Sequence, residues 1–142
     1  MLLRYLKISA MTTKKTILLV DDDQDYLYQL KSRVESFGFQ TILAESQKEA
    51  EELLEKTKPD LAILDLMMEN EDSGFILCYK MKKKYPEVPI IIATGVAAET
   101  GLNFDLNDEN NRKWIKADTF LEKGIRSEKL KLEIDKLLKV KA

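Results

Sequence analysis

The chain contains no histidine and a single cysteine, and both scarcities exclude kinds of chemistry. Without histidine there is no imidazole for a metal site, for a Ser-His-Asp triad or for acid–base catalysis near neutral pH. Because Cys78 has no second cysteine to pair with, an intramolecular disulfide, a cysteine-rich zinc site and a disulfide-stapled secreted scaffold are excluded. Any site chemistry must use carboxylates, hydroxyls and lysines, and we expect a reduced, cytoplasmic compartment.

Long apolar runs and a strong positive charge are also missing. No apolar run approaches the ~20 residues that span a bilayer, and the apolar part of residues 1–8 is too short for a secretory signal. Residues 1–15 hold four basic residues and no acid, so the remainder has 19 basic against 25 acidic residues, a net charge of −6. We therefore expect neither a nucleic acid nor a membrane as a direct partner.

At 142 residues the chain has room for one domain that can bury a core of its own. We expect residues 1–14 to form a flexible N-terminal extension and residues 15–142 to form the domain.

What the chain does contain is a regular alternation of short apolar runs and helical patterns. The pattern predicts strands at residues 16–20, 39–44, 61–65, 88–93 and 119–122. Helices are predicted at residues 25–37, 46–56 and 73–85, and from Ser127 onward. Ser46 and Glu49 form a capping-box pattern, Ser127 is the expected cap of the last helix, and Gly38 is a helix stop. Residues 96–116 are expected to be a long loop with one short helix that reaches Trp114.

Polar side chains lie where four of these strands end. Alternating strands and helices imply a parallel sheet with right-handed crossovers and helices on both faces. Ligands bind such sheets at the carboxyl ends of the strands. Asp21 and Asp22 follow the first strand, Asp65 ends the third, Thr94 follows the fourth and Lys123 follows the fifth. These side chains should therefore meet at one edge of the sheet.

The three carboxylates of Asp21, Asp22 and Asp65 would repel one another unless a cation lay among them. Oxygen ligands of this kind suit Mg²⁺ (or Mn²⁺). A carboxylate can also act as a nucleophile and carry an aspartyl-phosphate, and Asp65 is the candidate. The Lys123 ammonium would neutralise further charge on the transferred group, and the Thr94 hydroxyl would donate to a phosphoryl oxygen.

Two other readings of the acidic run were considered. The spacing of its aspartates is similar to the opening of an EF-hand loop, but Tyr26 and Ser32 occupy the required glycine and glutamate positions, which excludes it. The same run is similar to the nucleophile motif of haloacid-dehalogenase-type phosphatases. That alternative stays open, although it leaves Asp65 without a central role.

Four segments together resemble the signature segments of bacterial two-component response regulator receiver domains. They are residues 17–23 (Ile-Leu-Leu-Val-Asp-Asp-Asp), 60–68 (Asp-Leu-Ala-Ile-Leu-Asp-Leu-Met-Met), 89–95 (Pro-Ile-Ile-Ile-Ala-Thr-Gly) and 120–123 (Phe-Leu-Glu-Lys). The resemblance covers residues 15–140 and implies a flavodoxin-like, doubly wound fold with five parallel strands in the order 2-1-3-4-5. We expect a stand-alone receiver, similar to single-domain chemotaxis regulators.

The resemblance also implies roles for the acidic residues. Asp65 is the expected phosphoacceptor, which receives its phosphoryl group from a sensor histidine kinase or a phosphotransfer protein. Asp22 and Asp65 are expected to bind Mg²⁺ directly with the Met67 backbone carbonyl, and Asp21 largely through water.

Signalling in such a domain is expected to depend on a switch pair, here Thr94 and Phe120. The hydroxyl moves toward the phosphoryl group and the aromatic ring turns inward behind it. The output is expected to be altered binding of a downstream protein. We expect a regulatory protein, not an enzyme in the ordinary sense, and a monomer or weak homodimer.

The sequence departs from the family pattern at three places. Gly124 stands where proline usually follows the lysine, so we expect a trans bond before it. Glu69 stands where proline is usual after the acceptor strand and adds a charge close to the acidic cluster, and the segment between Thr94 and Phe120 is longer than usual. These departures support an alternative function, a pseudo-receiver that docks proteins without phosphorylation.

Overall fold

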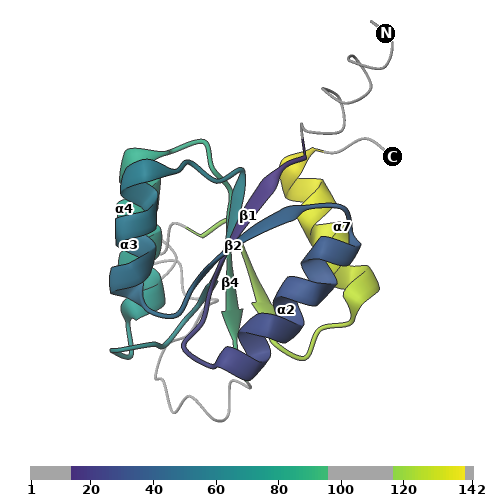
Figure 1. Ribbon diagram of the computed structural model, residues 1–142, viewed down its shortest axis with the longest axis horizontal. Coiled ribbons are helices and arrows are strands. Elements are labelled where there is room, and N and C mark those ends of the chain that lie inside the picture. The colour runs from purple at the N-terminus through teal and green to yellow at the C-terminus, as the bar shows by residue number, and fades with distance from the viewer. Residues whose placement is uncertain (1–13, 96–116, 140–142) are drawn as a thin grey trace, which may run out of the picture.

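The computed structural model describes residues 14–95 and 117–139, which form a five-stranded parallel sheet between two layers of helices (Figure 1). The strands are β1 (Thr16–Val20), β2 (Gln40–Ala44), β3 (Leu61–Asp65), β4 (Ile90–Thr94) and β5 (Thr119–Glu122). The helices are α2 (Gln24–Ser36), α3 (Gln47–Lys56), α4 (Ser73–Lys84) and α7 (Ser127–Leu138). The strand order β2-β1-β3-β4-β5 confirms the predicted flavodoxin-like topology.

The sheet separates two apolar cores, because successive side chains of a strand point to opposite faces. Figure 1 shows α3 and α4 on one face and α2 and α7 on the other. Leu18 and Leu64 belong to the core under α3 and α4, and Ile17 and Ile63 to the core under α2 and α7. All five residues of β3 are buried, which explains why the four that precede Asp65 form an unbroken apolar run. The Asp65 carboxylate therefore lies at the carboxyl end of the central strand of the sheet.

Most local signals acted as predicted. The Ser46 hydroxyl accepts a hydrogen bond from the Glu49 backbone N–H at 3.0 Å, and Gly38 follows α2 with φ +100°. β4 begins at Ile90, two residues later than predicted, because Pro89 has no N–H to donate to the sheet, although its carbonyl accepts from the Ala62 backbone N–H.

The predicted cap of the last helix was wrong. The N-cap of α7 is Arg126, which makes no side-chain cap bond. The Ser127 hydroxyl instead accepts a hydrogen bond from Arg33 Nε at 3.0 Å, and the Arg33 guanidinium also donates to the Ile125 carbonyl. Ser127 therefore makes a tertiary contact with α2 and does not cap α7.

Two sequence predictions concern parts of the chain outside the described residues. They are the N-terminal extension, of which residues 1–13 are not described, and residues 96–116 with Trp114. Within the described ranges, no helix is long and apolar enough to cross a membrane.

Candidate functional site

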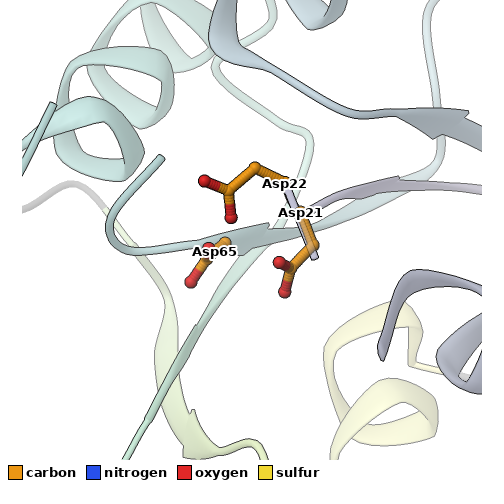
Figure 2. A group of neighbouring side chains, drawn as sticks. All are labelled: Asp21, Asp22 and Asp65. Atoms are coloured by element: carbon orange, nitrogen blue, oxygen red, sulfur yellow. The ribbon is translucent and has the colours of Figure 1, made fainter. Parts of the chain in front are cut away.

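The three predicted metal-binding carboxylates meet where β1 and β3 end side by side (Figure 2). One carboxylate oxygen from each of Asp21, Asp22 and Asp65 lies within 4.8 Å of the others. Asp21 and Asp65 are buried, whereas Asp22 is exposed. The carboxylates of Asp21 and Asp65 thus lie inside the protein, and that of Asp22 lies on the solvent side of the cluster.

Lys123 reaches this group from the end of β5. Its Nζ lies 2.7 Å from Asp21 Oδ2 and 3.2 Å from Asp65 Oδ1, so one ammonium group pairs with both buried carboxylates. The Lys123 backbone N–H donates to the Thr94 carbonyl at 2.8 Å. Lys123 is therefore held next to the carboxylates even though glycine, not proline, follows it. The bond between Lys123 and Gly124 is trans, as expected, since the described residues contain no cis peptide bond.

Tyr26 supports the lysine from α2. Its ring centroid lies 4.8 Å from Lys123 Nζ, within the range of a cation–π contact. Sequence reasoning missed this contact, since the two residues are 97 positions apart and nothing in the local pattern marks Tyr26 as part of the site.

The cluster carries more negative charge than the lysine can neutralise. Burial and the neighbouring Asp21 charge raise the pKa of Asp65 to about 7, against the opposing effect of Lys123. The pKa of Lys123 is also raised: burial alone would lower it, but its hydrogen bonds and charge pairs with Asp21 and Asp65 prevail. A divalent cation among three oxygen donors would relieve this repulsion, so the donor set fits Mg²⁺.

Hydrogen bonds at the start of α2 fix the direction of the acidic loop. Asp21 Oδ1 accepts from the Asp23 backbone N–H at 2.9 Å, and Asp23 Oδ1 accepts from the Tyr26 backbone N–H at 3.2 Å. Asp23 is therefore the N-cap of α2 and not a member of the carboxylate cluster. Of the three consecutive aspartates, two belong to the carboxylate cluster and one is the N-cap of the helix.

The predicted switch residues lie on the two strands beyond β3. Thr94 ends β4 and is paired with Glu122 of β5. Phe120 lies on β5, partly buried against the core under α3 and α4. Phe120 is paired with Ile92, in the middle of β4, so Thr94 and Phe120 lie on neighbouring strands two residue pairs apart. Their roles in switching stay predictions.

Gly74 lets α4 approach the end of β3. A Cβ at this position would lie 2.7 Å from Leu66 Cα and 2.8 Å from the Leu66 carbonyl oxygen, and still closer to the Asp65 carbonyl oxygen. The Gly74 backbone N–H donates to the Leu66 carbonyl at 2.8 Å. Sequence reasoning did not single out this glycine, although a glycine in the first turn of a helix can mark a close backbone contact.

Glu69 lies in the loop between β3 and α4 but its carboxylate binds another element. Glu69 Oε1 accepts from the Gln47 backbone N–H at 2.9 Å and Oε2 from the Lys48 backbone N–H at 3.2 Å. Although burial acts to raise it, these backbone donors lower the pKa of Glu69. The negative charge of Glu69, which the sequence placed near the acidic cluster, is thus hydrogen-bonded to the N-terminus of α3.

Residues 17–135 match the response regulator receiver domain family. The chain belongs to this family. Because the match covers residues 17–135, the receiver assignment replaces the alternative of a haloacid-dehalogenase-type phosphatase. Members of the family are signalling modules that are phosphorylated on an aspartate, generally bind Mg²⁺ at an acidic pocket and interact with histidine kinases or phosphotransfer partners.

Relatives of this receiver domain include regulators that are longer than it. The heme response regulator HssR of Staphylococcus saprophyticus is 32% identical over 124 residues, which are 87% of this chain and 51% of that protein. The probable transcriptional regulator ycf27 of Porphyridium aerugineum is 29% identical over 126 residues, 89% of this chain and 49% of that protein. The receiver domain thus spans about half the length of these relatives.

Solved structures share its fold over almost all of their length. A CheY-like receiver domain protein from Methanospirillum hungatei has a TM-score of 0.76 at 26% identity, with 89% of this chain and 95% of that one covered. The signal receiver domain of a histidine kinase from Syntrophus aciditrophicus has a TM-score of 0.73 at 29% identity, with 88% and 90% covered.

Proposed function

We propose that this receiver domain, residues 15–142, accepts a phosphoryl group on Asp65 from a histidine kinase or a phosphotransfer protein. One observation carries the proposal: Asp65 is buried at the end of a central strand, between two further carboxylates and the Lys123 ammonium. The 142 residues contain no histidine, so the phosphohistidine donor must come from outside them.

In the proposed transfer, an Asp65 carboxylate oxygen attacks phosphorus and the bond from phosphorus to the donor nitrogen breaks. The Asp65 carboxyl must be ionised to act as a nucleophile. Because its pKa is raised to about 7, it is only partly ionised near neutral pH, and a cation bound nearby would favour the ionised, reactive form. Mg²⁺ held by Asp21, Asp22, Asp65 and the Met67 carbonyl would neutralise part of the charge on the phosphoryl oxygens. Lys123 is already within ion-pair distance of Asp65 and would pair with one of the same oxygens.

The signal would leave the domain through a changed protein-binding surface. In this proposal the Thr94 hydroxyl donates to the phosphoryl group and Phe120 moves with it, which alters the surface around β4 and β5. The downstream target is a protein, the domain itself contacts no nucleic acid, and the setting is the cytoplasm. The acidic balance of residues 16–142 supports a protein partner over a nucleic acid.

The test is phosphorylation by a small phosphodonor. We expect the wild-type protein, incubated with acetyl phosphate and Mg²⁺, to gain the mass of one phosphoryl group, because Asp65 lies between charges suited to hold it. Asp65→Asn should gain none, and chelation of Mg²⁺ should prevent the gain in the wild type. Intact mass spectrometry gives the readout.

Asp25→Asn is the matched control, since Asp25 is an exposed acid in the first turn of α2 and lies outside the cluster. It should be phosphorylated as the wild type is. A folded wild-type protein that gains no mass from acetyl phosphate or from a phosphorylated donor protein would instead support the pseudo-receiver.

A further inference from the structure

The turn between β2 and α3, residues 44–48, contacts both segments that carry the site. On one side the Ala44 carbonyl accepts a hydrogen bond from the Asp21 backbone N–H at 3.1 Å. On the other side the backbone N–H groups of Gln47 and Lys48 donate to the Glu69 carboxylate at 2.9 and 3.2 Å. This β2–α3 turn is therefore hydrogen-bonded to the end of β1 and to the loop after β3 at the same time.

The loop after β3, residues 66–72, is held at three levels. At its base the Gly74 backbone N–H donates to the Leu66 carbonyl, and within it the Asn70 backbone N–H donates to the Ser73 hydroxyl at 2.9 Å. Ser73 itself is fully buried. Glu69 then ties the outer part of the loop to a different element, α3. Met67, whose carbonyl is the predicted metal ligand, lies between the base and this outer tie.

A carboxylate is well suited to the tie. It accepts two backbone N–H bonds, one on each oxygen, and charge-assisted bonds of this kind are stronger than neutral ones. The N-terminus of α3 also favours a negative charge through the helix dipole. The first-turn N–H groups of α3 are thus shared between Glu69 and the Ser46 hydroxyl, which accepts from the Glu49 N–H.

We propose that Glu69 is a positioning residue for the metal and phosphoryl site. By binding the N-terminus of α3, it fixes the Met67 carbonyl and the end of β3 at a set distance from Asp21 and Asp22. It acts through the β2–α3 turn and not as a ligand. The inference rests on the proposed function, because it concerns the geometry of that same site.

The test compares Glu69→Ala with Ser46→Ala. Each variant removes a side-chain acceptor from the first turn of α3, so both should lower stability, but only Glu69 joins α3 to the loop. We expect Glu69→Ala to raise the Mg²⁺ Kd about tenfold, as loss of a residue that orients metal ligands does, and Ser46→Ala to leave it within about twofold. Titration calorimetry measures the Kd. Glu69→Gln, which keeps one acceptor oxygen, should restore part of the affinity.

A second readout needs no metal. In the Mg²⁺-free protein, Glu69→Ala should speed hydrogen exchange at the amides of Ser73 and Gly74, and Ser46→Ala should not. The proposal is overturned if these amides are unaffected by Glu69→Ala, or if Ser46→Ala raises the Kd equally. It is also overturned if Mg²⁺ speeds exchange at Gln47 and Lys48 in the wild type, because Glu69 would then leave α3 for the metal.

Failure of the function itself is distinguishable. A wild-type protein that binds no Mg²⁺ and takes no phosphate would contradict the proposed function, while metal-free exchange at Ser73 and Gly74 would still decide whether Glu69 holds the loop.

Discussion

Asp65 binds a proton more tightly in the folded domain than in the unfolded chain, because its pKa rises from an ordinary 3.8 to about 7. A carboxyl with a raised folded-state pKa contributes stability below its unfolded pKa. That contribution is lost as the pH rises through the folded value. In the absence of metal, the acidic site therefore destabilises the fold most above pH 7, where the buried Asp65 carboxyl is ionised.

Asp65→Asn removes that charge, and we expect it to stabilise the metal-free protein at pH 8 by about 1 kcal/mol. At pH 5 the gain should be much smaller, because the wild-type carboxyl then already carries its proton. Urea unfolding with a chelator present, at both pH values, measures the difference. Asp25→Asn, which removes an exposed charge outside the cluster, should show no such pH dependence. Equal gains for Asp65→Asn at pH 5 and pH 8 would contradict the assignment.

Among the elements, β3 and α4 approach each other closely at Gly74, next to the site. We expect Gly74→Ala to destabilise the domain by about 2 kcal/mol, since its Cβ would collide with backbone atoms of Asp65 and Leu66 that cannot move independently. It should also slow phosphorylation, because a displaced Asp65 backbone would move the carboxylate that is the proposed phosphoacceptor. Thermal unfolding and acetyl phosphate labelling measure the two effects.

Gly124→Ala is the matched control, because a Cβ there meets no atom within 4 Å and the glycine does not require a positive φ. It should be nearly neutral in stability. If Gly74→Ala were equally neutral, the close approach of α4 would not constrain the end of β3.

The same elements show what sequence alone could predict. Apolar runs, Ser46 and Gly38 gave the order and nearly all the bounds of the strands and helices, because these signals act over a few residues. The signals that failed depend on distant contacts: Ser127 lost its capping role to Arg33, 94 residues away. Asp21, Asp22 and Asp65 could be placed together from topology, whereas the contacts of Tyr26 and Glu69 join distant segments and have no local sequence signal.

For the whole molecule, we expect Mg²⁺ binding to raise the free energy of unfolding. Mg²⁺ that binds only the folded state adds about 1.4 kcal/mol at ten times its Kd, which corresponds to a rise in Tm of roughly 3–5 °C. Asp22→Asn should remove most of this rise, because Asp22 is one of three oxygen donors in the cluster. Differential scanning calorimetry at matched ionic strength provides the measurement, with KCl in place of MgCl₂ as the salt control. A Tm that Mg²⁺ does not change would count against the site.

The position of β5 in the sheet has a consequence for how the domain can respond. β5 is a four-residue edge strand, hydrogen-bonded on one side only among the described strands, and none of its residues is fully buried. In contrast, Asp21 follows the interior strand β1 and Asp65 ends the interior strand β3, and the residues of both strands are almost all buried. Local opening costs least at such margins. The two buried aspartates are thus anchored in the interior of the sheet, whereas Phe120 lies on the edge strand and Lys123 directly follows it. We therefore expect Phe120 and Lys123 to change position at a lower free-energy cost than the aspartates.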